Sequence, residues 1–406
     1  MKSYLEDKNK IACYGCEACA QICPASAIEM HEDEELFRYP KVDLNKCIHC
    51  DLCRKVCPVE NKPVAYEKDK YAYGGHNINA DVLNESTSGG AFSAITENWC
   101  DENYVIFGAV SEGLEVHHCF ISDKTELYKF RRSKYSQSKI GSAYKDAKAF
   151  LKAGKKVLFS GTPCQIAGLI NFLGNSNRDN LLTCEVVCEG VPTPLYIKSL
   201  DRHLEKKYGS PIESLDYRCK DMKSLQKPYK GKWDFQVMKI SLKNGRKLKK
   251  DRWFNPFWSV WLQHLMSRPS CYECPFASAA RIADITLGDL WGVHIYCPEL
   301  YNRNAGASLV VCNTEKGTEA FKKAAIYMEG HKLSFESALK YQGPMRNHIS
   351  GNEHREEFMK DVKEMDYPSL CKKWAVGPSA KLLWQKYVWG NRQKVWLWNL
   401  KNRSAN

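Results

Sequence analysis

The sequence contains no apolar run of about 18 residues, the length that a helix needs to cross a bilayer, so we expect no membrane-spanning helix. Its first ten residues, MKSYLEDKNK, lack the apolar core of a signal peptide, which predicts a cytoplasmic protein. No nucleic-acid-binding motif is present, and the lysines are spread as on a solvated surface, although the formal net charge is +13. The sequence therefore argues against an integral membrane protein, a secreted protein and a nucleic-acid-binding protein.

Cysteine, in contrast, is abundant, with 19 cysteines among 406 residues. Thiols stay reduced in the cytoplasm, so this number indicates metal or redox chemistry rather than disulfide bonds. Eight of the cysteines lie in two matched runs, CYGCEACAQICP at residues 13–24 and CIHCDLCRKVCP at residues 47–58. Residues 27–43, between the two runs, alternate as two short strands do.

The spacing C-x2-C-x2-C-x3-C-P is typical of bacterial ferredoxins that hold two 4Fe-4S clusters. The first three cysteines of each run bind one cluster, and the fourth binds the other. The first cluster is therefore expected to take Cys13, Cys16, Cys19 and Cys57, and the second to take Cys47, Cys50, Cys53 and Cys23. Zinc is the alternative, but zinc sites use pairs of C-x2-C with longer gaps.

From residue 71 onward, strand and helix patterns alternate. Short apolar runs at 71–77, 104–110, 156–161 and 181–188 predict strands, with helices between them, and this order indicates a parallel α/β unit. The dipeptide Asn244-Gly245 predicts a hairpin turn. The expected fold is an α+β ferredoxin-like two-cluster domain (1–65), an α/β body (66–330) and a helical C-terminal extension (331–406).

Four further cysteines come from three places in this body. Cys164 follows one predicted strand and Cys188 closes the next, so both thiols reach one crevice if these strands are neighbours. Cys271 and Cys274 form another C-x2-C pair. The four could hold a third cluster. The alternatives are a low-pKa thiol at a helix start for Cys164, a small buried residue for Cys188 and half a zinc site for the pair.

Two glycine-containing turns suggest a different chemistry. Ser88-Gly89-Gly90 and Gly161-Thr162 each open a predicted helix. Backbone N–H groups at helix N-termini favour phosphate groups, although tight turns also need glycine for steric reasons alone. A phosphate-bearing cofactor is therefore one interpretation of these turns.

Several segments resemble the coenzyme F-420 hydrogenase/dehydrogenase beta-subunit family. In chain order they are the two cysteine runs, STSGGAFSAI, SKYSQSKIG, VLFSGTPCQIAGL, CEGVPTP, CYECPF and ADITLGDLWG, and they span about residues 10–315. The resemblance implies a flavin-binding α/β body, with FAD and a 4Fe-4S cluster, fused to a two-cluster ferredoxin domain. Where the family often has the turn CHG, this chain has Glu189 in place of the histidine.

The resemblance also implies roles for individual residues. It assigns the third cluster to Cys164, Cys188, Cys271 and Cys274. It places the flavin near Ser88, Gly89, Gly90, Lys134, Ser136, Gln137, Ser138 and Thr162. It identifies no catalytic residue. His76, His117 and His118 are available, but lone histidines are more often surface or packing residues.

Together these features predict an iron–sulfur flavoprotein oxidoreductase. A ferredoxin or another redox protein would supply electrons to the clusters, and the flavin would pass them to an organic acceptor such as a deazaflavin. The alternative is a non-catalytic electron-transfer subunit that docks onto a separate redox enzyme. The aromatic and basic stretch 381–403 predicts either an interfacial helix on an anionic membrane, giving a membrane-peripheral protein, or a helix packed on the body.

Overall fold

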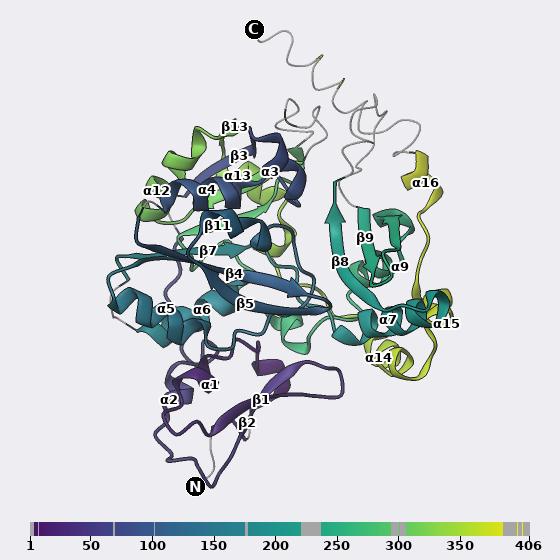
Figure 1. Ribbon diagram of the computed structural model, residues 1–406, viewed down its shortest axis with the longest axis horizontal. Helices are drawn as coiled ribbons and strands as arrows, with labels where there is room; N and C mark the ends of the chain where they lie inside the picture. The colour runs from purple at the N-terminus through teal and green to yellow at the C-terminus, as the bar shows by residue number, and fades with distance from the viewer. Residues whose placement is uncertain are drawn as a thin grey trace.

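The computed structural model describes residues 4–6, 8–67, 70–100, 102–174, 178–220, 237–293 and 306–384, together with residues 300, 396 and 400. These residues form β-sheets of two, eight and three strands. Figure 1 shows the cysteine-rich N-terminal part in purple, the large sheet above it and the small sheet to one side. Within the described ranges, no helix is long and apolar enough to span a membrane.

The N-terminal part, residues 8–67, combines a hairpin with short helices. Its elements are a 3-10 turn at Lys10–Ala12, α1 (Ala18–Ile22), β1 (Ile28–Glu32), β2 (Arg38–Val42) and α2 (Leu52–Lys55). The antiparallel pair β1–β2 confirms the two strands predicted between the cysteine runs. Each short helix begins inside a cysteine run, after a residue in the left-handed conformation, Glu17 or Asp51. The chain thus turns sharply between successive cysteines.

The eight-stranded sheet has the order β13-β3-β12-β11-β7-β6-β4-β5. Its strands are β3 (Tyr71–Asn77), β4 (Tyr104–Glu112), β5 (Glu115–Ile121), β6 (Lys156–Gly161), β7 (Leu181–Val186), β11 (Ile285–Asp289), β12 (Ser308–Cys312) and β13 (Met328–Leu333). The neighbours β4, β6 and β7 are parallel, as the sequence predicted, and β11 adds a further parallel strand. The predicted strand β3 instead pairs antiparallel with both β12 and β13, and β5 and β12 are antiparallel to β4 and β11, respectively. Because β6 adjoins β7, Cys164 and Cys188 follow neighbouring strands.

Helices cover both faces of this sheet. They are α3 (Ala80–Glu85), α4 (Ala91–Trp99), α5 (Ala143–Lys152), α6 (Pro163–Leu173), α12 (Glu315–Ala325) and α13 (Phe335–Lys340), with a 3-10 segment at Lys124–Phe130. One core joins α5 and α6 to side chains such as Val105 and Phe159, and the other joins α4 and α12 to the alternate residues, such as Ile106 and Leu158. The alternation follows from the two-residue period of a strand.

The small sheet has the order β10-β9-β8 and its own core. Its strands are β8 (Ile212–Cys219), β9 (Val237–Leu242) and β10 (Lys247–Asp251), and its helices are α7 (Pro194–Tyr208), α9 (Pro256–Leu262), α14 (Arg355–Glu364) and α15 (Tyr367–Trp374). The hairpin β9–β10 turns at Asn244-Gly245, as predicted. Shorter segments complete the described chain: Arg252–Phe254, Pro269–Glu273, Gly343–Met345 and α16 (Ala380–Leu383).

Residues beyond 330 share cores with the body. The boundary expected at residue 330 falls inside β13, which pairs with β3. Phe358 and Leu370, from α14 and α15, are buried in the core of the small sheet. Of the stretch 381–403, only residues 381–384, 396 and 400 are described, so the helix predicted there lies outside the described residues.

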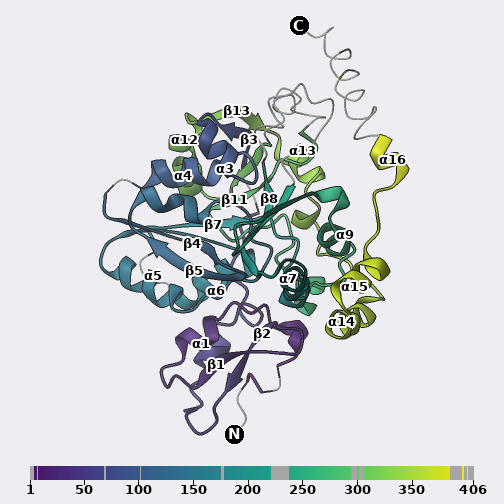
Figure 2. The same cartoon turned by 45° about the vertical axis from the view of Figure 1, so that its right-hand side comes forward.

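The N-terminal part lies directly below the body in Figure 2, and hydrogen bonds join the two. Gln21 in α1 accepts hydrogen bonds through its Oε1 from the backbone N–H groups of Tyr144 (3.0 Å) and Lys145 (3.2 Å), in the first turn of α5. Glu17 accepts another from the N–H of Gly141 (3.1 Å). Ser142, the N-cap residue of α5, makes no side-chain cap hydrogen bond. The N-terminal part therefore caps a helix of the body.

Replacing Gln21 with alanine is expected to destabilise the protein by about 1 kcal/mol, the usual effect of losing a helix N-cap. Amide hydrogen exchange at Tyr144 and Lys145 should accelerate. Gln21→Glu keeps the acceptor, adds a charge favourable at a helix N-terminus and removes the Nε2 donor, which has no partner among the described residues. Equal exchange in the alanine and wild-type proteins would show that α5 does not need this cap.

Candidate iron–sulfur and cofactor sites

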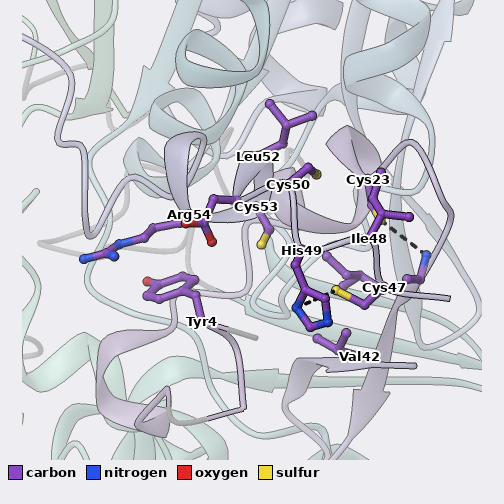
Figure 3. A pocket seen from close by; sticks show the side chains of 13 residues that line it. Tyr4, Cys23, Val42, Cys47, Ile48, His49, Cys50, Leu52, Cys53 and Arg54 are labelled. Atoms are coloured by element: carbon purple, nitrogen blue, oxygen red, sulfur yellow. Dashed lines mark hydrogen bonds between the residues drawn. The ribbon is translucent and has the colours of Figure 1, made fainter. Parts of the chain in front are cut away.

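The four cysteines predicted for the second cluster line one cavity of about 380 Å³. Cys23 comes from the end of the first run, and Cys47, Cys50 and Cys53 come from the second (Figure 3). Ile48 and His49 also line it, and the Ile48 side chain is 63% exposed. Cys50 is exposed as well. This cavity therefore lies at the surface, within reach of a partner protein.

The four cysteines predicted for the first cluster line a second, narrower cavity. Cys13, Cys16 and Cys19 come from the first run, and Cys57 from the second. The two cavities thus divide the eight thiols in the crossed pattern that the spacing predicts. Cys16 also packs on the body, because a Cβ added to Gly168 of α6 would lie 3.1 Å from its Sγ. Among the described residues, no three His, Cys, Asp or Glu side chains converge on the position of a single metal ion.

Cys57 has a polar environment that the sequence did not indicate. Lys8 donates a hydrogen bond to its Sγ at 2.9 Å, and the Tyr4 hydroxyl donates another at 3.5 Å. Burial opposes ionisation, but these two donors outweigh it and hold the pKa of the Cys57 thiol below its usual value. The residues present favour a thiolate at this position, which is the form that binds iron.

The structure also brings together the third set of four cysteines. Burial raises the pKa of Cys188 well above its usual value, and repulsion from Cys271, Cys164 and Cys274 raises it further. Burial likewise raises the pKa of Cys271 to about 12, with repulsion from Cys164 and Cys274, and that of Cys164 to about 11, with repulsion from Cys274. The charges of all four cysteines in the set thus act on one another. Four half-buried thiols whose charges repel one another suit a bound iron–sulfur cluster, whose iron ions would stabilise the thiolate form.

A buried ion pair fixes the loop that carries Cys271 and Cys274. Arg281 is 2% exposed, and it pairs with Glu185 of β7, which is 0% exposed. The Arg281 Nη1 donates to the backbone oxygens of Phe276 (2.9 Å) and Ser278 (3.1 Å), in the segment that follows Cys274. The third set is thereby held against the end of a sheet strand.

Glu185→Gln is expected to lower the free energy of unfolding by about 3 kcal/mol, because it leaves the Arg281 guanidinium buried without a carboxylate. Thermal unfolding of the reconstituted protein measures the change. Glu205→Gln, at an exposed position on α7, is the matched control and should unfold like the wild type. A midpoint for Glu185→Gln equal to that of the control would contradict the role given to this pair.

One arginine connects the first and third cysteine sets. Arg268, three residues before Cys271, is 1% exposed. Its Nε donates to the backbone oxygen of Cys13 (2.9 Å), its Nη2 to that of Arg38 (3.0 Å) and its Nη1 to the Gln137 side chain (2.9 Å). These three acceptors are neutral. A buried guanidinium is costly without negative charge nearby. Anionic clusters on both sides would supply that charge, so the residues fit the predicted groups.

An aromatic pair lies beside this arginine. Tyr14, between Cys13 and Cys16, packs edge-on against Phe276, with 5.6 Å between ring centroids. Burial raises the pKa of the Tyr14 hydroxyl, as do the charges of Cys274, Cys164 and Cys271. Tyr14 is therefore adjacent to both cysteine sets.

The residues expected near the flavin fall into two groups. Ser88, Gly89 and Gly90 lead into α4, and a Cβ on Gly89 would lie 2.4 Å from the backbone N of Ser308 and 2.3 Å from the backbone O of Gly75. Close packing alone therefore requires glycine at position 89. Ser88 donates through its Oγ to the backbone oxygen of Ala307 at 2.7 Å.

The second group lies near the third cysteine set. Gln137 binds the backbone oxygen of Tyr14 (2.8 Å), and Ser138 shares hydrogen bonds of 2.9 Å with His118 and Gln165. The Thr162 hydroxyl is 3.2 Å from the Sγ of Cys164. These side chains already have partners within the protein.

Lys134 and Ser136 lie in the chain segment that leads into Gln137 and Ser138 of the second group. Lys134 donates to the backbone oxygen of Arg131 at 2.8 Å, and burial lowers its pKa to about 8. The next residue, Tyr135, packs on Trp258 with 4.8 Å between ring centroids. Ser136 is half-buried.

Sequence reasoning missed two residues at the end of β8. Lys220 donates to the backbone oxygens of Ser88 (2.5 Å) and Leu83 (2.6 Å), and Arg218 pairs with Asp289 at the carboxyl end of β11 (2.6 Å). Neither belongs to a motif. Only the three-dimensional fold brings them to the Ser88 turn.

Crossed cysteine sets in an N-terminal part, joined to an α/β body with a third set, point to the class of iron–sulfur proteins. Two family models match the chain: residues 12–61 match a 4Fe-4S dicluster domain, and residues 154–334 match the C-terminal domain of the coenzyme F420 hydrogenase/dehydrogenase beta subunit. The chain therefore carries a dicluster domain followed by a domain of this beta-subunit type, which confirms the resemblance noted in the sequence. The first range holds all eight cysteines of the two runs, and the second holds the four cysteines of the third set.

Among solved structures, a chain of the F420-reducing NiFe hydrogenase complex from Methanosarcina barkeri is similar. The two are 16% identical, and the match covers 76% of this chain and 92% of that chain with a TM-score of 0.42. A search of curated proteins finds no match.

Proposed function

We propose that this protein is an iron–sulfur flavoprotein oxidoreductase that passes electrons from a ferredoxin or another redox protein to an organic acceptor. When bound, 4Fe-4S clusters exchange single electrons, and a flavin exchanges either one or two. The observation that carries the proposal is the continuous series of cysteine sets, from the surface cavity around Cys50, through the cavity around Cys16, to the set around Cys164.

The chain's own residues fix the order of this series. Exposed Cys50 and Ile48 leave the second set open to a partner protein. Cys16 packs on α6, the helix that carries Cys164 at its start. Arg268 and Gln137 hold the backbone of Cys13, Tyr14 and neighbouring residues against the body. Because Arg268 is buried and bonds to the Cys13 backbone, the first and third sets are expected to keep a fixed separation.

The experiment separates this function from that of a non-catalytic electron-transfer subunit. The full chain is reconstituted anaerobically with iron, sulfide and FAD, passed through a gel-filtration column and mixed with a reduced ferredoxin. We expect flavin absorbance to be retained and then bleached. Reduction of the iron–sulfur absorbance without any retained flavin would contradict the proposal and support the subunit role.

A further inference from the structure

Two buried side chains, Arg218 and Trp258, both contact Tyr135 and carry hydrogen-bond donors that are not satisfied among the described residues. Arg218 is 5% exposed; its Nη1 donates to Asp289 (2.6 Å) and to the Tyr135 hydroxyl (3.4 Å), but its Nε and Nη2 have no partner among the described residues. Trp258 is 3% exposed, and its Nε1 likewise has none there. A buried donor without a partner destabilises the folded protein. All three are donors, so the missing partner is an acceptor.

The charge around these donors has the same sign. Lys220, 7% exposed, lies two residues after Arg218, and the Arg252 guanidinium lies 5.3 Å from the ring centroid of Trp258. The Asp289 carboxylate acts on both Arg218 and Lys220, and it pairs directly with Arg218. Among the described residues, Arg218 and Lys220 thus share one carboxylate, which leaves positive charge to attract an anion in this buried region.

The free edge of Arg218 also has a definite shape. Nε and Nη2 are the two nitrogens whose N–H groups point in parallel along one side of the guanidinium. This edge binds two oxygens of a phosphate or carboxylate at once. Asp289, which pairs with Arg218, lies at the carboxyl end of β11, and parallel sheets bind their ligands beyond the carboxyl ends of their strands. Lys220 ties the site to the Ser88 turn.

We propose that Arg218 and Lys220, with Trp258, form a binding site for an anionic oxygen group, a phosphate or a carboxylate, carried by the protein's small organic redox ligand. This rests on the proposed function, which requires such a ligand. The group belongs either to the flavin nucleotide or to the electron acceptor, and both have the same chemistry at this site.

The first arm of the test measures equilibrium binding of riboflavin, FMN and FAD to the flavin-free, cluster-reconstituted full chain. If the flavin supplies the anion, FMN or FAD should bind at least about tenfold more tightly than riboflavin, since hydrogen bonds to charged groups contribute about 1.5–3 kcal/mol. Arg218→Lys keeps the charge opposite Asp289 but loses the two-nitrogen edge, so most of this preference should disappear while riboflavin binding is unchanged.

The second arm does not depend on flavin. Inorganic phosphate and succinate are added to the same protein, and the thermal midpoint is measured. If the acceptor supplies the anion, either probe should raise the wild-type midpoint, but not that of Arg218→Lys, while the three flavins bind equally. Arg202→Lys, at an exposed position on α7, is the matched control, and an unchanged iron content in each variant shows that it folds.

The outcomes are distinct. The anion site is overturned if FMN and FAD bind no more tightly than riboflavin and neither phosphate nor succinate raises the thermal midpoint. It is also overturned if the flavin preference or the rise in midpoint is unchanged in Arg218→Lys. Failure of all three flavins to bind overturns the flavin function, and the second arm then decides the anion site alone.

Discussion

Replacing Cys188 with serine should remove about four of about twelve iron atoms per chain and stop electrons from reaching the flavin. The charges of all three other cysteines of the third set act on Cys188, so loss of the Cys188 thiol would deprive the proposed third cluster of a ligand. The eight cysteines of the dicluster domain line separate cavities and should keep their iron. Iron analysis gives the first result. The second comes from mixing with reduced ferredoxin, where the iron–sulfur absorbance should bleach and the flavin absorbance should persist.

Cys119→Ser is the matched control for this variant. Cys119 lies in β5, is half-buried like Cys188 and belongs to none of the three sets. It should retain about twelve iron atoms and reduce its flavin at the wild-type rate. Full iron content in Cys188→Ser would show that the third set does not hold a cluster.

Replacing Arg268 with methionine is expected to have two large effects. It leaves buried acceptors at Cys13, Arg38 and Gln137 without their donor, which should cost about 3 kcal/mol or more. It also removes a buried positive charge beside Cys164 and Cys271. Since a reduced cluster is more negative than an oxidised one, the midpoint potential of the adjacent clusters should become more negative.

Two further variants separate these effects. Arg268→Lys keeps the charge but cannot make the three hydrogen bonds, so its thermal midpoint should fall while the cluster potentials stay near the wild-type values. Arg202→Gln, exposed on α7, should change neither. Redox titration followed by electron paramagnetic resonance measures the potentials. Potentials that are identical in the methionine, lysine and wild-type proteins would rule out an electrostatic role for Arg268.

The local sequence pattern was sufficient to predict the structure where a single segment specifies its own fold. The strands at 71–77 and 156–161 have the predicted bounds, because each is a short run with turn residues on both sides. The division of eight cysteines between two cavities also follows from spacing, since the fourth cysteine of each run cannot reach the first three. The antiparallel direction of β12 and β13 did not follow, because strand direction depends on long connections rather than on local sequence.

The residues that sequence reasoning missed act over long separations. Arg268 contacts Cys13 across 255 positions, and Gln21 caps a helix that begins more than a hundred residues later. Neither residue stands in a motif, and an isolated arginine or glutamine is usually a surface residue. Their burial becomes visible only after the N-terminal part has been placed against α5 and α6.

The proposed electron path requires that one chain hold three iron–sulfur clusters in fixed order. The most direct test is the metal and sulfide content of the wild-type protein, purified without oxygen and measured together with zinc. We expect about twelve iron atoms and about twelve sulfides per chain, with negligible zinc. About eight iron atoms would remove the third cluster, and zinc in place of iron would contradict the whole account.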